Sequence, residues 1–92
     1  MLTKGERKAL MVARALIESG ERNYICFALG AAWAMGVCSR KELCRLKRYI
    51  QDQLGAGESG SLWGWQKERG MFPTDDQIRK DRIAWIDWML DQ

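Results

Sequence analysis

The sequence predicts an all-α fold, a compact bundle of four main helices with a fifth, short helix at 61–68. Apolar residues recur at helical spacing along most of the chain, and alternating strand patterns are almost absent. A Ser or Thr precedes a Glu or Gln by three residues at three places, which is the spacing of a helix capping box. Because 92 residues suffice for one core and not for two, we expect a single helical domain over 1–92.

The first expected helix begins after Thr3, which forms a capping-box spacing with Glu6, and ends at Gly20, since glycine is a common helix stop. The second covers 24–35. Twelve residues without a charge indicate a helix that is contacted from several sides, so we expect it at the centre of the bundle. Gly30 costs this helix about 1 kcal/mol relative to Ala, and we expect a close tertiary contact to justify it.

The third expected helix spans 40–54, from a capping box at Ser39 and Glu42 to a stop at Gly55. Apolar residues at helical spacing form the stripe that should face the core, namely Leu43, Leu46, Ile50 and Leu54. Basic residues occupy the rest of the helix: Lys41, Arg45 and Arg48 project almost opposite the stripe, and Arg40 and Lys47 flank it.

A glycine-rich connection at 55–61 leads into the short helix at 61–68. Trp63 and Trp65 lie beside this connection, and aromatic side chains are enriched at interface hot spots, so we consider both candidate anchors for a partner. The remaining tryptophans occur at helical spacing and are expected in the core: Trp33, Trp85 and Trp88.

The last helix is expected to begin after Thr74, which forms a third capping-box spacing with Gln77, and to end near Leu90. Its apolar arc covers roughly 220° at 100° per residue, which is wider than one packing face requires. Either two neighbouring elements cover the arc or a second copy of the chain does. The candidate residues for self-association, as a homodimer, are Ile83, Ile86 and Leu90.

The residue counts argue against an enzyme. The chain has no His, so Ser-His-Asp, Cys-His and HExxH sites are impossible within it, and acidic residues without a phosphate-binding loop give no specific catalytic pattern. Cys26, Cys38 and Cys44 are odd in number and contain no CxxC pair, which fits neither a disulfide framework nor a zinc site. We therefore expect reduced, mostly packed thiols, no catalytic residue, no metal and no cofactor.

No membrane span is expected. The uncharged stretch at 24–39 has 16 residues, whereas a transmembrane helix needs about 20. Charge is distributed unevenly along the chain: residues 1–50 carry ten Lys or Arg against four Asp or Glu, and residues 51–92 carry five against eight. This uneven distribution of charge favours association with an acidic partner, while a net charge of +3 is weak evidence for binding of nucleic acid.

Two segments carry a resemblance to known proteins. Residues 19–29, SGERNYICFAL, and residues 82–90, RIAWIDWML, with the basic helix between them, resemble small accessory proteins encoded by tailed bacteriophages. The resemblance covers most of the chain in order and rests on loose motifs: Gly20, Ile25, Cys26, Ala28 and Leu29, then Arg82, Ala84, Trp85 and Asp87. It implies a phage or prophage origin and action in the cytoplasm of the bacterial host, and it carries over no catalytic residue.

Small phage proteins of this kind often bind and redirect a host protein, including defence complexes such as CRISPR effectors. By that analogy we expect a non-enzymatic inhibitor or modulator of a bacterial host protein or complex. The alternative is a small DNA- or RNA-binding regulator whose basic third helix contacts phosphates. In either case, replacing Lys41, Arg45 and Arg48 by Glu should leave stability nearly unchanged and abolish binding.

Overall fold

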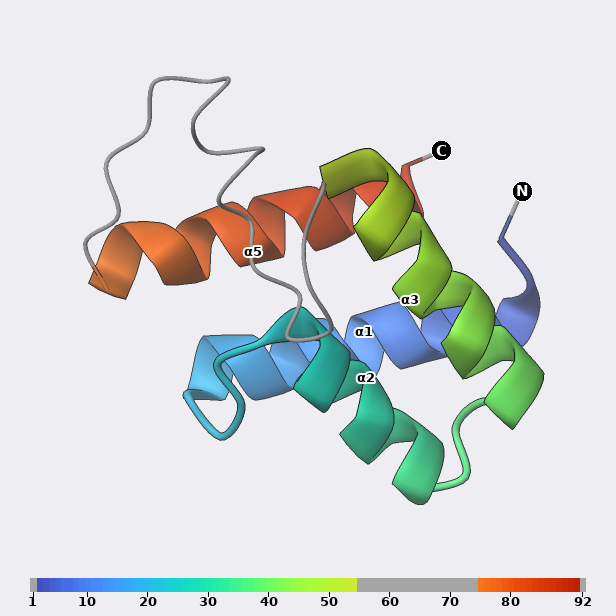
Figure 1. The fold of residues 1–92 in the computed structure, drawn as a ribbon. Helices are drawn as coiled ribbons and strands as arrows, with labels where there is room; N and C mark the ends of the chain where they lie inside the picture. The colour runs from blue at the N-terminus through green and yellow to red at the C-terminus, as the bar shows by residue number, and fades with distance from the viewer. Residues whose placement is uncertain (1, 55–74, 92) are drawn as a thin grey trace.

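The computed structural model of this protein describes residues 2–54 and 75–91. Four helices are seen there, as Figure 1 shows: α1 (Lys4–Ser19), α2 (Ile25–Ala34), α3 (Arg40–Leu54) and α5 (Asp75–Leu90). The described residues contain no strand, so the prediction of an all-α bundle is confirmed. The short helix expected at 61–68 and the capping box at Thr74 lie outside the described residues.

Both ends of α1 and the start of α3 are those that the sequence predicts, while the stop expected at Gly55 lies outside the described residues. At the start of α1, the Glu6 amide donates to Thr3 Oγ1 at 3.1 Å, and the Thr3 amide donates to Glu6 Oε1 at 2.8 Å. The same reciprocal pair begins α3, with 3.1 Å from the Glu42 amide to Ser39 Oγ and 3.0 Å from the Ser39 amide to Glu42 Oε1. Gly20 ends α1 at φ 82°, a left-handed conformation that glycine adopts without strain.

The central helix is α1, which packs against α2, α3 and α5. Figure 1 shows α5 running antiparallel beside α1, while α2 and α3 cross in front of it. The expectation that the charge-free helix α2 is the centre is therefore wrong. A charged helix can occupy this place because one side of it stays uncovered: Lys4, Lys8 and Glu18 are exposed. At the edges of the packed side, Arg7 Nη1 donates to the Leu90 carbonyl at 2.8 Å, and Arg14 Nε donates to Asp87 Oδ1 at 2.8 Å.

The core is formed by side chains from all four helices. The fully buried members with the largest volumes are Trp85, Leu10, Ile17, Ile25, Leu29, Leu46, Ile50 and Ile86. Of the three tryptophans expected in the core, Trp85 is confirmed. Trp33 is 43% exposed and Trp88 is 46% exposed, so the prediction is wrong for both. Helical spacing places a residue on an angular position of its helix, but it does not tell which neighbours cover that position.

The outer face of α2 is apolar and exposed. The lack of charged residues in this helix therefore does not mean that the helix is surrounded on all sides. The helix buries Ile25, Cys26, Ala28, Leu29 and Ala32, while the outward side chain of Phe27 is 58% exposed. Gly30 also lies on the outer side, since a Cβ atom built there would have no atom of a neighbouring element within 4 Å. The expected close contact at Gly30 is therefore absent from the described structure.

Candidate interaction surface

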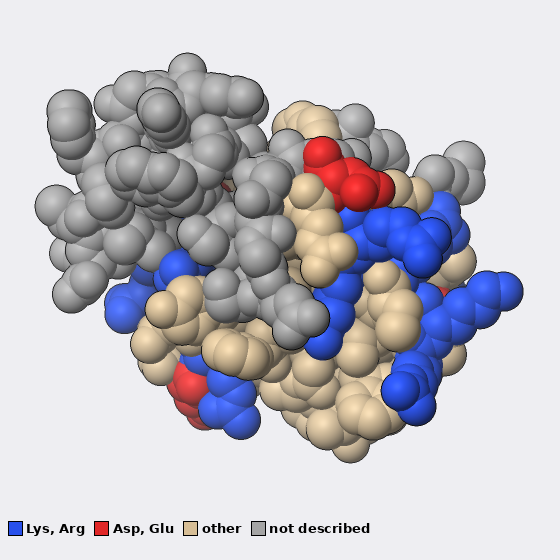
Figure 2. All heavy atoms as spheres, in the orientation of Figure 1, with Lys and Arg blue, Asp and Glu red and all other residues tan. Residues whose placement is uncertain are grey.

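The α3 helix presents basic side chains away from the core. Leu43, Leu46 and Ile50 are buried, as the apolar stripe predicts. On the rest of the helix, Arg40, Lys41 and Arg48 are exposed and Lys47 is half-buried. These four residues are called the α3 basic face below. Figure 2 shows basic side chains gathered over this part of the molecule, with little acidic surface between them.

The cations of the α3 basic face have no partner within the described part of the chain. No ion pair or side-chain hydrogen bond involves Arg40, Lys41, Lys47 or Arg48 there. The only acidic residue among residues 33–48 is Glu42, and its carboxylate is already occupied. Its Oε1 accepts from the Ser39 amide, and its Oε2 accepts from the Thr3 hydroxyl. Among the described residues, the positive charge on this face is therefore not paired with an acidic side chain.

Arg45 belongs to the fold rather than to the free surface. Its Nη1 lies 3.4 Å from Oε1 of Glu6, a side chain with no exposed surface. Its Nη2 donates to the Tyr49 hydroxyl at 3.0 Å, and its guanidinium lies 5.5 Å from the centre of that ring. The hydrogen bond to Tyr49, followed by the charge of Glu6, raises the pKa of Arg45. An Arg45→Glu substitution would place two carboxylates together, so Arg45 is unsuitable for the charge reversal that the sequence suggested.

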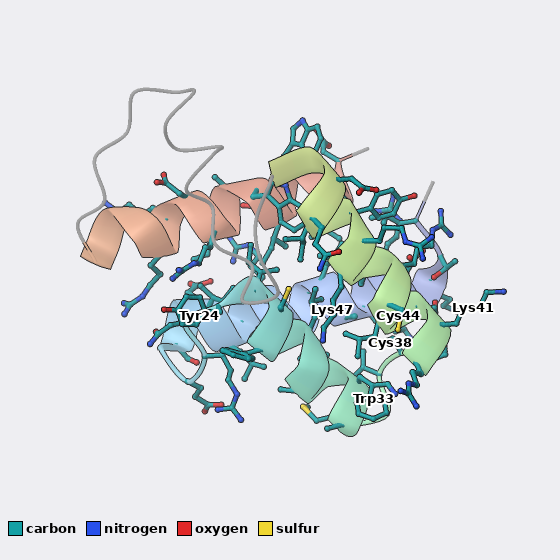
Figure 3. All side chains as sticks on the ribbon, viewed as in Figure 1. Tyr24, Trp33, Cys38, Lys41, Cys44 and Lys47 are labelled. Carbon is teal, nitrogen blue, oxygen red and sulfur yellow. The ribbon has the colours of Figure 1, made fainter. Side chains whose placement is uncertain are left out.

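Cys44 lies at the middle of the α3 basic face and is exposed, in contrast to the packed thiols that the sequence predicts. The four cations precede and follow it by three or four residues, which places them on the same side of the helix. Figure 3 shows Cys44 on α3 with Lys41 on one side and Lys47 on the other. The spacing alone could have revealed this arrangement. What it could not reveal is that the centre of the face remains uncovered.

The other two cysteines confirm the expectation of packed, reduced thiols. Cys26 and Cys38 are buried, and all three cysteines are free. Burial raises the pKa of the Cys38 thiol, and the nearby negative charges of Glu42 and Glu6 raise it further. Because the thiolate is the reactive form, Cys38 is protected from thiol reagents in two ways: the side chain is buried, and its raised pKa keeps it protonated. Cys44 is thus the thiol at which a reagent can report on the basic face.

The remaining predicted site residues fall into two groups. Trp63 and Trp65 lie outside the described residues, so their role as anchors stays a prediction. In α5, Ile86 is fully buried, and Ile83 and Leu90 are partly buried against the core. Packing within the chain therefore covers these three residues fully or in part, and their role in self-association stays a prediction. Among the described side chains of α5, the large apolar one that is exposed is Trp88.

Two further observations concern the chemistry of the described residues. Within 2–54 and 75–91, no group of three or more Cys, Asp or Glu side chains is arranged to hold a metal ion. Every helix described there is too short or too polar to cross a membrane. The features that could recognise a partner are surface charge on α3 and exposed apolar side chains on α1, α2 and α5.

Six large apolar side chains are exposed among the described residues: Met11, Tyr24, Phe27, Trp33, Met35 and Trp88. Tyr24 is edge-on to Phe27, with ring centres 5.6 Å apart, and the Arg82 guanidinium lies 4.7 Å from the centre of the Tyr24 ring. Burial lowers the pKa of Arg82, while the electrostatic effect of Tyr24 opposes that change.

Comparison of the chain with protein-family models, with curated proteins and with solved structures gave no match.

Proposed function

We propose that this chain is a non-enzymatic accessory protein of bacteriophage origin that binds a host protein in the bacterial cytoplasm and inhibits or redirects it. A host defence complex of the CRISPR type is the target that the resemblance suggests. The observation that carries the proposal is the α3 basic face, whose four cations lack acidic partners in the described structure. Such a face steers association with an acidic surface and selects against basic ones.

The way in which α3 is fixed supports a binding role. The capping box at Ser39 and Glu42 holds its first turn, and Arg45 joins its middle to the buried Glu6 of α1. Glu42 also accepts from Thr3, so the starts of α1 and α3 are held together. A face carried on a fixed helix loses less conformational freedom when a partner binds, which favours affinity.

The test is capture of partners from bacterial lysate by the tagged full chain, with and without nuclease. The informative variant is Lys41→Glu with Arg48→Glu, because both side chains are exposed. The matched control is Lys8→Glu with Lys80→Glu, which changes the net charge equally on exposed positions of α1 and α5. We expect one stoichiometric host protein that survives nuclease, is retained by the control variant and is lost from the α3 variant.

Two results would contradict the proposal. Recovery of only nuclease-sensitive, nucleic-acid-associated proteins would favour the alternative, a regulator whose basic helix contacts phosphates. In that case the affinity for random DNA would fall steeply with added salt, because phosphate contacts release counterions. Equal capture by the α3 variant and the wild type would instead remove the α3 basic face from consideration.

Cys44 supplies a second measurement on the unmodified chain. A maleimide should label Cys44 well before the buried Cys26 and Cys38. When the captured host protein is bound, labelling of Cys44 should slow several-fold, since a partner seated on the α3 basic face covers the thiol. An unchanged rate at saturating partner would place the contact elsewhere on the molecule.

A further inference from the structure

We infer that the partner recognised by this chain presents an acidic protein segment with a large apolar side chain, seated on α3 and on the exposed end of α2 together. The inference rests on the proposed function and adds the chemistry of the partner. It is carried by the combination of the α3 basic face with Trp33 and Met35, which is called the α2–α3 surface below.

The chain connectivity brings the two parts of this surface together. Trp33 lies in the last turn of α2, Met35 is the residue that caps it, and α3 begins five residues later at Arg40. The connection turns sharply at Gly36, where φ is 79°, and the Gly36 amide donates to the Trp33 carbonyl at 2.9 Å. In Figure 3, Trp33 lies at the end of α2, below Cys38 and the start of α3.

The turn between the helices is held from inside. The Val37 amide donates to the Ala32 carbonyl at 3.0 Å, and Cys38 is buried against the core. Ser39 then caps α3 through Glu42. The exposed side chains of Trp33 and Met35 are therefore carried on a backbone that is bonded on both sides of the turn, and they keep a fixed relation to the first turn of α3.

The exposed parts of this surface are of two kinds. Trp33 is 43% exposed and Met35 is 66% exposed, and both are large apolar side chains. No acidic residue occurs anywhere from 24 to 41. Within the described residues, these apolar side chains thus adjoin the α3 basic face, and the carboxylate of the nearby Glu42 is engaged by the Thr3 hydroxyl and the Ser39 amide. A partner that covers both must bring negative charge to the α3 side and apolar area to the α2 side.

The composition of the surface favours a protein segment over nucleic acid. Trp, Met and Arg are enriched at protein interfaces, whereas Lys, which supplies two of the four cations, is depleted there. A single-stranded nucleic acid would require a groove that tracks its backbone and aromatic faces for successive bases. Here the cations lie on the convex side of one helix, and the eight residue steps from Arg40 to Arg48 span about 12 Å at the rise of an α-helix. Met35 also offers no ring on which a base could stack.

The test compares two short fluorescein-labelled peptides by fluorescence anisotropy with the full chain. Both are rich in Glu; one has a central Phe and the other has Ser in its place. We expect the Phe peptide to bind about tenfold more tightly, which corresponds to partial burial of one aromatic side chain. Met35→Ala and Trp33→Ala should each reduce this difference, whereas Met11→Ala, at an exposed apolar position on α1, should leave it unchanged.

Two variants protect the test against loss of folding. Met35 is the more exposed of the pair, so Met35→Ala should keep the melting temperature of the wild type even if Trp33→Ala does not. Lys41→Glu with Arg48→Glu should weaken binding of both peptides and preserve the ratio between them, because it removes charge and leaves the apolar side intact.

Three outcomes would overturn the inference: equal affinity for the two peptides, no binding of either, or tighter binding of a single-stranded oligonucleotide of matched charge. Failure of the inference can be separated from failure of the proposed function. If a host protein is captured from lysate while the two peptides bind equally, the partner chemistry inferred for the α2–α3 surface is wrong and the proposed function stands. If the Phe peptide is preferred but no host protein is captured, the proposed function fails alone.

Discussion

Glu6 and Arg45 each have a role in the structure that differs from the one indicated by the sequence. By sequence, Glu6 is half of a capping box and Arg45 is one of five cations on a helix. In the structure, Glu6 is fully buried and Arg45 reaches it from α3 while also contacting Tyr49. A buried carboxylate needs a nearby cation because its desolvation is costly. Arg45 thus contributes to stability, whereas the side chains of Lys41 and Arg48 on the same helix are exposed.

The Glu42 carboxylate should make the protein sensitive to acid. Hydrogen bonds from the Thr3 hydroxyl and from the Ser39 amide lower its pKa below the ordinary value of 4.5. A group with a lowered pKa in the folded state stabilises the fold above its ordinary pKa, and that stabilisation is lost as the pH falls through the folded-state value. We expect the melting temperature to fall below about pH 4.5, and to fall less in Glu42→Gln.

The measurement is thermal unfolding followed by circular dichroism at a series of acidic pH values. Gln can still complete a capping box, so Glu42→Gln should keep the helical signal at neutral pH. Glu21→Gln, at an exposed position between α1 and α2, is the control, and its acid transition should match the wild type. An identical loss of stability in wild type and Glu42→Gln would show that this carboxylate does not control the acid response.

At the level of single elements, the two glycines Gly30, inside α2, and Gly36, after it, differ in whether a side chain can replace the hydrogen of glycine. Gly30 lies inside the helix, and a Cβ atom there would meet open space. Gly36 also has open space around it, but its φ of 79° is one that other residues rarely adopt. The first position therefore tolerates a side chain and the second does not, although both glycines look alike in the sequence.

We expect Gly30→Ala to stabilise the protein by about 0.5–1 kcal/mol, because Ala has the higher helix propensity. Gly36→Ala should destabilise it by about 1–2 kcal/mol, because the left-handed conformation strains any residue that has a Cβ atom. Urea unfolding of both variants gives the two free energies. Destabilisation by Gly30→Ala would indicate that the outer face of α2 is covered in solution.

The helix ends were predictable from the sequence because their causes are local. Thr3 with Glu6, and Ser39 with Glu42, form capping boxes whose partners lie three residues apart, and Gly20 needs only its own backbone conformation. The faces of α3 were predictable for the same reason, because charge and hydropathy separate cleanly around one helix. The candidate basic surface follows directly from that pattern.

The packing of the helices against one another was not predictable in this way. The absence of charge in α2 indicated a central position, yet its outer side is exposed at Phe27. Which helix is central depends on contacts between residues far apart in the chain, such as Arg7 with the Leu90 carbonyl and Arg14 with Asp87. No local pattern records these pairs. The exposure of Trp33 and Met35, and hence the apolar part of the α2–α3 surface, depends on the same long-range arrangement.

At the scale of the whole molecule, the two ends of the chain are held together through α1 and α5. Arg7 caps the end of α5, and Trp85, Ile86 and Met89 are buried in the common core. Because α1 contacts each of the other three helices, loss of α5 packing should weaken all of them. We therefore expect the chain to unfold as one cooperative unit, with the helical and tryptophan signals lost in a single transition.

Trp85 and Trp88 provide a test of that cooperativity. Trp85 has no exposed surface and Trp88 is 46% exposed, although they lie three residues apart on α5. Trp85→Ala should cost about 3–5 kcal/mol of unfolding free energy through lost burial and a cavity, and Trp88→Ala about 1 kcal/mol or less. Trp85→Phe should cost less than Trp85→Ala, because a ring is kept and the indole N–H, which has no hydrogen-bond partner among the described residues, is removed.

Urea unfolding monitored at once by circular dichroism and fluorescence would measure these differences. If Trp85→Ala produced two separate transitions, with part of the helical signal surviving the loss of α5 packing, the helices would not form one unit. If the two Trp→Ala variants were equally destabilised, the burial that distinguishes Trp85 from Trp88 would not hold in solution. A single shifted transition for Trp85→Ala, with little change for Trp88→Ala, is the outcome required by a core in which α1 joins every helix to α5.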